Sequence, residues 1–209
     1  MTQQNPSYAD WQPTLQRVMT YLVGKIEDYS RVCKERTGEP AYEHLIYRVK
    51  SIDSMNEKCV RKGLPVSAPL RELNDAIGIR IVCRFIDDIY TNLEAIRSFP
   101  FCRIIKEKDY ISHVKPNGYR SYHIIIEVTA PFEDIDGKNP GRFFAELQLR
   151  TIAMDSWASL EHEVKYKQDI EDPALIIEEL KRCADELAAC DLSMQTISHL
   201  IRKNHKKES

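Results

Sequence analysis

The sequence lacks the features that mark a membrane or secreted protein. No apolar run approaches the roughly 20 residues that cross a bilayer, and the first residues, MTQQNPSYADW, contain no apolar signal region. Six cysteines are present, but no two of them form a C-x-x-C pair. We therefore expect a cytoplasmic protein that keeps its thiols reduced and has no membrane partner.

An excess of charge of one sign is also lacking. Lysine and arginine total 30 against 32 acidic residues, for a net charge of −2. This balance disfavours a general DNA- or RNA-binding protein, because phosphate contacts need a wide basic surface.

The length and composition suit one globular domain with helical extensions, since the 209 residues have 43% hydrophobic content and no evident internal repeat. Two local basic clusters suit a phosphate site: Arg48, Lys50, Lys58, Arg61 and Lys62, and then Arg103, Lys106, Lys108, Lys115 and Arg120.

Helical spacing of apolar residues predicts long helices towards both ends of the chain. One runs from Trp11 to about Tyr29, and the last two run from about Ile152 to Lys167 and from Pro173 towards Arg202. The final helix has apolar positions that step by alternating fours and threes, a heptad-like seam that predicts packing on the first helix or on another subunit. The seam consists of Ile176, Leu180, Cys183, Leu187, Cys190, Met194, Ile197 and Ile201.

Strands and shorter helices are expected between these ends. Helices are predicted from Ser51 to about Lys62 and from about Asp87 to Arg97. The interleaved strands indicate an α/β or α+β domain with one sheet of about five strands. The expected strands are Glu43–Lys50, Ile77–Phe85, Phe101–Lys108, Ser121–Val128 and Phe143–Arg150.

Two isolated acids lie among the arginines of these strands. Magnesium usually takes one or two protein carboxylates plus substrate phosphates, so Asp75 and Glu146 would suffice as ligands. Lys58 and Arg61, one helical turn apart, suit the remaining phosphate charge. On spacing alone, however, structural salt bridges are the better explanation of such charges.

Four segments resemble, in order and separation, the synthetase domain of RelA/SpoT proteins: YRVKSIDSMNEKCVRKG, LNDAIGIRIVCRFIDD, NGYRSYHIIIEV and AELQLRTIAMDSWASLEHEVKYK. The likeness is greatest to the stand-alone small alarmone synthetases of the RelQ and RelP kind. It implies a nucleotidyltransferase-like fold with a mixed central sheet and long terminal helices. The chain would divide into an N-terminal helical extension (1–40), a synthetase domain (41–168) and a C-terminal helical extension for oligomerisation (169–209).

The resemblance also implies a reaction. The 3′ hydroxyl of GTP or GDP attacks the β-phosphorus of ATP, AMP leaves, and the product is pppGpp or ppGpp, the alarmone of the bacterial stringent response. Asp75, in the D-x-x-G-x-R motif, resembles the magnesium ligand, and Glu146 resembles the acid that shares the metal and activates the hydroxyl. Such a transfer gains mainly from alignment and charge neutralisation.

The remaining site residues follow from the same resemblance. Arg48 and Arg80 look like the pair that sandwiches adenine, while Lys50, Lys58 and Arg61 match positions at the ATP phosphates. On the guanosine side, Tyr119 matches the aromatic residue that stacks on guanine, and Asp155 the residue that reads the guanine edge. The other residues expected near the guanosine sugar and phosphates are Lys115, Arg120, His123, Gln148 and Arg150.

Further properties of the family set expectations about activity and assembly. Its hydrolase half has no counterpart in these 209 residues, so we expect no hydrolase activity. Stand-alone relatives form homotetramers through terminal helices, which agrees with the heptad-like seam. Some RelQ-like members also bind an alarmone as an allosteric ligand, but the sequence departs from the RelQ pattern near Tyr42 to Ile46.

Two alternative functions stay open at this point. One is an enzyme of the same fold that uses another acceptor, either adenosine nucleotides or the 3′ end of tRNA. The other is a non-catalytic module that binds alarmones or RNA. Tyr119 with Asp155 favours a guanine acceptor, and the presence of both Asp75 and Glu146 argues against a module without catalysis.

Overall fold

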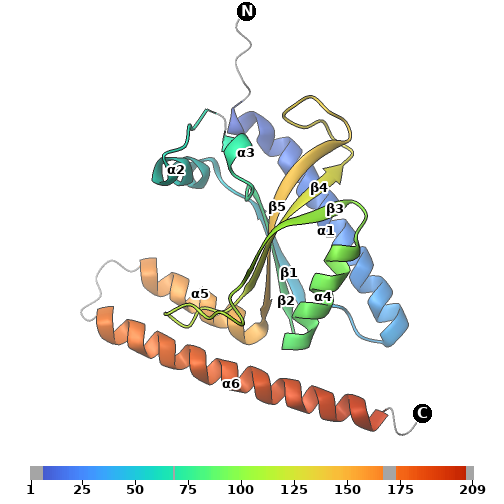
Figure 1. Cartoon of the computed structure of the whole chain (residues 1–209), viewed down its shortest axis with the longest axis vertical. Coiled ribbons are helices and arrows are strands. Elements are labelled where there is room, and N and C mark those ends of the chain that lie inside the picture. The colour runs from blue at the N-terminus through green and yellow to red at the C-terminus, as the bar shows by residue number, and fades with distance from the viewer. Residues whose placement is uncertain (1–6, 68, 167–172, 206–209) are drawn as a thin grey trace, which may run out of the picture.

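A computed structural model describes residues 7–67, 69–166 and 173–205 and arranges them as a sheet with helices on both faces (Figure 1). The expected boundary between residues 168 and 169, and the expected helix end at Lys167, lie outside the described residues. In chain order the elements are α1 (Tyr8–Thr37), β1 (His44–Val49), α2 (Ile52–Lys62), α3 (Pro69–Glu72), β2 (Ile77–Cys83), α4 (Ile86–Ser98), β3 (Cys102–Asp109), β4 (Tyr122–Ala130), β5 (Gly141–Thr151), α5 (Ile152–Tyr166) and α6 (Pro173–His205).

The sheet is mixed, with five strands in the order β1-β2-β5-β4-β3. β2 and β5 are parallel, and the β1–β2, β5–β4 and β4–β3 pairs are antiparallel. The parallel pair lies near the middle of the sheet, where both of its strands are flanked by others. This arrangement confirms the α+β fold with one mixed sheet of about five strands.

Local signals set the element ends, and they extend α1 beyond its predicted range. Ser7 and Asp10 form a capping box at its start, and Gly38 ends it in the left-handed conformation with φ 81°. Because the last two turns of α1 are largely exposed and polar, the apolar period could not reveal them. In α2 the side chain of Ser51 accepts a hydrogen bond from the backbone N–H of Ser54, as expected of an N-cap.

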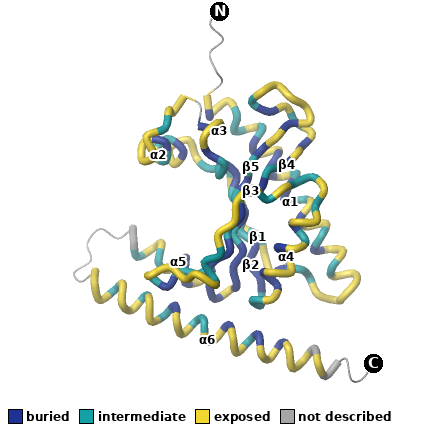
Figure 2. The backbone as a smooth tube through the Cα atoms, viewed as in Figure 1, coloured by how far each residue is buried: buried dark blue, intermediate teal, exposed yellow. Residues whose placement is uncertain are grey.

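The main hydrophobic core lies between one face of the sheet and the helices α1 and α4 (Figures 1 and 2). Leu22 of α1, Ile79 of β2 and Leu147 of β5 are all at most 2% exposed. Alternation along each strand sends these side chains to the core and their neighbours to the opposite face. On that opposite face, called the open face below, α2 and α5 lie towards the two ends of the sheet (Figure 1), and strand residues line cavities with them.

The last helix, α6, runs across one end of the sheet and packs on α5 and α4 (Figure 1). Of the two predicted partners of its seam, the first helix is not among the elements on which α6 mainly packs, and another subunit stays a prediction. The first half of the seam is partly buried in this packing, whereas Ile197 and Ile201 are more than half exposed. The buried face continues instead through the polar residues Asp191, Gln195 and Ser198, which heptad spacing of apolar residues could not show. Of the described helices, none is long and apolar enough to span a membrane.

Candidate active site

Strand register brings the predicted polar residues into two rows across the open face of the sheet. In one row Arg48 lies opposite Gly78, and Gly78 lies opposite Glu146. In the next row Arg80 lies opposite Gln148, and Gln148 lies opposite His123. Residues from distant parts of the chain therefore share one surface because the strands that carry them are neighbours.

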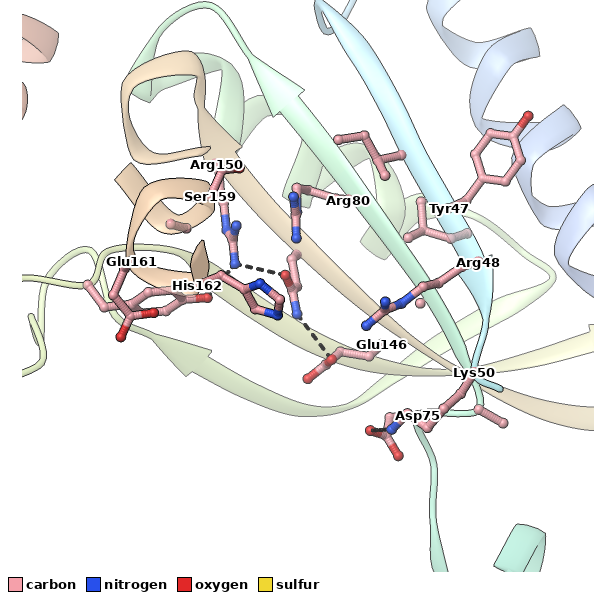
Figure 3. A pocket seen from close by; sticks show the side chains of 17 residues that line it. Tyr47, Arg48, Lys50, Asp75, Arg80, Glu146, Arg150, Ser159, Glu161 and His162 are labelled. Carbon is pink, nitrogen blue, oxygen red and sulfur yellow. Dashed lines mark hydrogen bonds and ion pairs between the residues drawn. The ribbon is translucent and has the colours of Figure 1, made fainter. Parts of the chain in front are cut away.

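Apart from His123, the residues of these rows line a cavity of about 570 Å³. Figure 3 shows Arg48, Arg80 and Arg150 projecting from adjacent strands into this space, with Glu146 on the floor and Asp75 at one end. Gly78 has no side chain, which leaves the space between Arg48 and Glu146 open. The remaining wall comes from α5 and β1, through Ser159, Glu161, His162, Ile46 and Tyr47.

Asp75 is held by two lysines at the end of the cavity. Its Oδ2 atom lies 2.5 Å from Lys50 Nζ and also accepts a hydrogen bond from Lys58 Nζ. Burial acts to raise the pKa of Asp75, but the hydrogen bonds and charges of the two lysines outweigh it, and the pKa lies below its usual value. The carboxylate is therefore ionised at neutral pH. It lies between Lys50, which directly follows β1, and Lys58 of α2.

Glu146 is held by His123 of the neighbouring strand β4 and by Gln148 of its own strand, β5. Its Oε1 lies 3.5 Å from His123 Nδ1, and its Oε2 accepts a hydrogen bond of 3.2 Å from Gln148 Nε2. Burial acts to raise the pKa of Glu146, yet the hydrogen bond and charge of His123 lower it below the usual value. Glu146 is thus a carboxylate at neutral pH that can accept a proton.

The donor set fits a magnesium ion that is completed by substrate. The Oδ1 atom of Asp75 is buried and, within the described part of the chain, has no hydrogen-bond partner. Among residues 7–67, 69–166 and 173–205, no group of three or more His, Cys, Asp and Glu side chains converges as a complete metal site. One or two carboxylates with open positions are typical of magnesium sites that bind nucleotide phosphates.

A buried cluster around Arg150 supports the far wall of the cavity. Arg150 is 4% exposed, and its guanidinium donates to Asp155 Oδ1 (3.0 Å), Gln148 Oε1 (2.9 Å) and the hydroxyl of Tyr119 (2.6 Å). Asp155 Oδ1 also lies 2.9 Å from Arg80 Nη1. Asp155, predicted to read a guanine edge, therefore holds two arginines of the site.

Tyr119 and Lys115 are on the loop between β3 and β4. The hydroxyl of Tyr119 lies 2.8 Å from His123 Nε2, and its ring borders the cavity. The ammonium of Lys115 lies 4.5 Å from the centroid of the Tyr119 ring and 4.4 Å from that of Tyr110. The structure thus brings together Tyr119, His123 and Arg150, which the sequence predicted to be neighbours.

A second cavity, of about 260 Å³, adjoins the first, because Asp75 and Glu146 line both. Lys58, Lys62, Lys106 and Lys108 line it together with His123. Lys58 was predicted at the ATP phosphates, whereas the sequence signalled Lys62, Lys106 and Lys108 only as members of basic clusters. Arg61, predicted at the ATP phosphates, is exposed on α2 and is not among the described residues that line either cavity.

Two further positions are notable. Arg120, predicted near the guanosine phosphates, points towards α6, where Nη1 lies 3.1 Å from the carbonyl oxygen of Ala184. Asn117, which sequence reasoning missed, donates from Nδ2 to Glu161 Oε1 at 3.0 Å. Its place directly before Gly118 and Tyr119 in the NGY motif is the signal that could have revealed it.

Comparisons with known proteins agree with this geometry. Residues 47–171 match the family described as a region found in RelA/SpoT proteins. The chain is 42% identical to GTP pyrophosphokinase YwaC of Bacillus subtilis over 151 residues, which cover 71% of this chain and 70% of that protein.

Solved structures extend the likeness to the whole fold. The small alarmone synthetase 2 of Bacillus subtilis has a TM-score of 0.79 at 36% identity, over 92% of this chain and 99% of that one. The small alarmone synthetase 1 of the same organism, solved with its product pppGpp, has a TM-score of 0.79 at 28% identity, over 90% of this chain and 94% of that one. With the family match, the two cavities and the mixed sheet in agreement, this chain belongs to the RelA/SpoT family.

Proposed function

We propose that this chain is a GTP pyrophosphokinase, which moves the β,γ-pyrophosphate of ATP to the 3′ oxygen of GTP or GDP and releases AMP. The observation that carries the proposal is the pair of ionised carboxylates, Asp75 and Glu146, shared by two adjoining cavities whose walls are rich in arginine and lysine. Adjoining basic cavities that share two acids suit two nucleotides, one of which attacks the phosphate chain of the other through its 3′ hydroxyl. The printed names of the relatives, GTP pyrophosphokinase and small alarmone synthetase, support the same reaction.

On the donor side, Arg48 and Arg80 would hold the adenine. Both line the larger cavity, and guanidinium planes stack well on aromatic rings. Lys50 and Lys58, already gathered at Asp75, would meet the phosphates of ATP, and Arg61 would have to turn inward to join them.

On the acceptor side, Tyr119 would stack on guanine, an interaction of roughly 1 to 3 kcal/mol per base. His123, Gln148 and Arg150 would surround the sugar because they lie between Tyr119 and Glu146. Lys115 would meet the phosphate tail. We infer that Asp155 acts on both nucleotides through Arg80 and Arg150, since one of its oxygens already holds both.

The chemistry needs a base and charge neutralisation. Glu146 would accept the proton of the 3′ hydroxyl while the new oxygen–phosphorus bond forms and the bond to AMP breaks. Asp75 and Glu146 would hold a magnesium ion, which would neutralise phosphate charge. Lys50 and Lys58 would hold the phosphate chain in line with the attacking oxygen, and alignment of this kind is a large part of such catalysis.

Two alternatives follow from the same fold. The acceptor could be an adenosine nucleotide or the 3′ end of tRNA, which Tyr119 alone would not exclude because stacking tolerates every base. A module that binds without turnover would need neither carboxylate. The retained pair of acids favours the enzyme.

The direct test is to incubate the purified chain with γ-labelled ATP, magnesium and, separately, GTP, GDP, ATP alone or tRNA. Label in a guanosine penta- or tetraphosphate, together with AMP, is the expected result. Label on an adenosine nucleotide or on tRNA would change the acceptor. Nucleotide binding without transfer would instead support the binding module.

We also propose that residues 41–168 act as the synthetase unit and that the terminal helices join copies into a homotetramer in the cytoplasm. Apolar side chains that remain more than half exposed on α6 support the assembly: Leu175, Ile177, Leu192, Ile197, Leu200 and Ile201. Light scattering coupled to size exclusion measures the mass directly. A monomer near 24.3 kDa at micromolar concentration would contradict the tetramer.

A further inference from the structure

The loop of residues 110–121, which carries Tyr119, is hydrogen-bonded to the last helix, α6. Arg120 reaches from this loop to α6, where Nη1 donates to the carbonyl oxygen of Ala184 at 3.1 Å and Nη2 donates to Asp185 Oδ1 at 3.2 Å. Nη1 also lies 3.3 Å from the carbonyl oxygen of Gly118. One side chain thus joins the loop's own backbone to the backbone and a side chain of α6.

Gly118 shows how closely the loop approaches the helix. Its φ is +89°, in the left-handed region, and a Cβ at this position would lie 2.5 Å from the Cβ of Ala184. Both a glycine on the loop and a small residue on the helix are therefore required for the two backbones to meet. The loop and the helix are therefore in direct van der Waals contact at Gly118 and Ala184, and Arg120 lies beside this contact.

The part of α6 that contains Leu180 and Ala184 also supports Tyr119, through Trp157. Trp157 of α5 donates its indole N–H to the carbonyl oxygen of Leu180 at 2.7 Å, and the Trp157 and Tyr119 rings meet edge to face with centroids 6.2 Å apart. A small cluster of buried residues, Trp157, Ala158 and Ala184, links the helix to the tyrosine. Trp157 thus connects α6 to the ring of Tyr119.

Arg120 itself faces away from the nucleotide cavities. It lines neither of the two cavities that contain Asp75 and Glu146, and it borders instead a small one between the loop, α5 and α6. Its side chain is 19% exposed. To meet a phosphate, its charged guanidinium would have to leave three oxygen acceptors, on Gly118, Ala184 and Asp185.

We propose that Arg120 is a positioning residue that clamps the Tyr119 loop to α6, so that the docking of α6 sets the affinity for the acceptor nucleotide. This inference rests on the proposed function, since it assigns Tyr119 to the acceptor. It differs from the role implied by resemblance, in which Arg120 meets the phosphate tail of guanosine. The two roles differ in how they depend on the length of that tail.

The test compares Arg120→Met, which keeps most of the stem, with Asp185→Ala on α6. Arg182→Met is the matched control, because Arg182 also lies on α6 but bonds Glu179 and Glu186 of the same helix. For each variant the KM values for GDP, GTP and ATP, the kcat and the melting temperature are measured.

A second experiment measures acceptor binding without turnover. A Trp11→Phe background leaves Trp157 as the single tryptophan, so its fluorescence can be followed as GDP is added in the absence of ATP.

We expect Arg120→Met to raise the KM for GDP and for GTP by the same factor, about tenfold, which is what 1.4 kcal/mol gives. The KM for ATP should change less than about twofold, and Arg182→Met should match the parent, because among the described residues Arg120 bonds Gly118, Ala184 and Asp185 and not Arg182 or the residues proposed for ATP. The dissociation constant of GDP from Trp157 fluorescence should rise with the KM. A much larger loss for GTP than for GDP would assign Arg120 to the phosphate tail and overturn the clamp.

If Arg120→Met lowers the melting temperature but leaves the KM values unchanged, the clamp is also overturned, because the contact of Arg120 with α6 would then serve stability alone. If Arg120→Met does not fold, Asp185→Ala decides the matter. An increase of about threefold in both acceptor KM values, as expected for loss of one exposed partner, supports the clamp, and unchanged values contradict it. If the parent protein transfers no pyrophosphate, the proposed function fails, while the fluorescence titration still tests the clamp.

Discussion

Arg150 and Asp155 form a buried ion pair under the cavity, with 3.0 Å between Nη1 and Oδ1. The same oxygen of Asp155 lies 2.9 Å from Nη1 of Arg80, so one carboxylate holds arginines from two neighbouring strands. Because Arg80 lines the larger cavity and Arg150 bonds Tyr119, the two sides of the site share a single electrostatic anchor.

Asp155→Asn is expected to weaken both sides of the site together. Loss of the buried charge should destabilise the fold by about 3 kcal/mol and raise the KM values for both ATP and the acceptor. Melting curves and steady-state kinetics measure these effects. ITP, which lacks the 2-amino group, tests the other role: we expect the ratio of GTP to ITP activity to be the same in the variant and the parent. If the ratio collapses in Asp155→Asn, the carboxylate reads the guanine edge.

Asp75→Asn and Glu146→Gln should each reduce kcat by about 10²-fold or more, because each removes a charge that acts in the transition state. Both amides keep the shape of the side chain, so circular dichroism should show a folded protein. Glu127→Gln is a suitable control, since Glu127 is a strand carboxylate that pairs with Arg103 and Arg142. Near-normal turnover in either site variant would exclude that residue from the metal site.

The acid stability of the protein should depend on Asp75. Burial acts to raise its pKa, but Lys50 and Lys58 hold the pKa below the unfolded value of about 3.9. Its contribution to the free energy of unfolding is therefore complete above that pH and is lost as pH falls through the folded pKa. Urea unfolding between about pH 5 and pH 2.5 should show a shallower acid slope in Asp75→Asn than in the parent. The exposed Asp53→Asn on α2 serves as the control, and equal slopes in all three proteins would contradict the prediction.

Gly78→Val should block the larger cavity while leaving the fold intact. A Cβ at Gly78 would lie 4.0 Å from the carbonyl oxygen of Arg48, an ordinary contact, and valine suits a strand. The branched side chain would fill the space between Arg48 and Glu146, so binding of a non-hydrolysable ATP analogue should weaken by at least about tenfold. Calorimetric titration measures the affinity, and unchanged affinity would show that the donor does not occupy this part of the cavity.

Gly24→Ala is the matched glycine variant. Gly24 lies in α1 with no described atom within 4 Å of its added Cβ, and alanine favours a helix over glycine by roughly 0.5–1 kcal/mol. We expect it to raise the melting temperature and to leave nucleotide binding unchanged. Together the two variants separate the effect of an added side chain on the fold from its effect on the cavity.

Much of this protein is determined by the sequence itself. Alternation along Ile77–Cys83 and Gly141–Thr151 set which side chains enter the core, and Ser51 with Gly63 set the ends of α2. These signals are local, because a period of two or a cap depends only on residues close in the chain. The acids and arginines of the motifs were assigned to one site by their resemblance to the RelA/SpoT synthetase domain, because their spacing alone favoured structural salt bridges.

Contacts between distant segments were decided only by the tertiary structure. Strand order placed Lys106 and Lys108 beside Asp75 and Glu146, and no pattern within β3 could indicate that. Arg120 lies next to Tyr119 in sequence, yet its bonds go to α6, 64 and 65 positions away. The apolar seam of α6 likewise did not reveal that this helix would meet the Tyr119 loop through Ala184 and Asp185. Such partners are set by how whole elements pack, and packing depends on shape and polar satisfaction across the molecule rather than on local spacing.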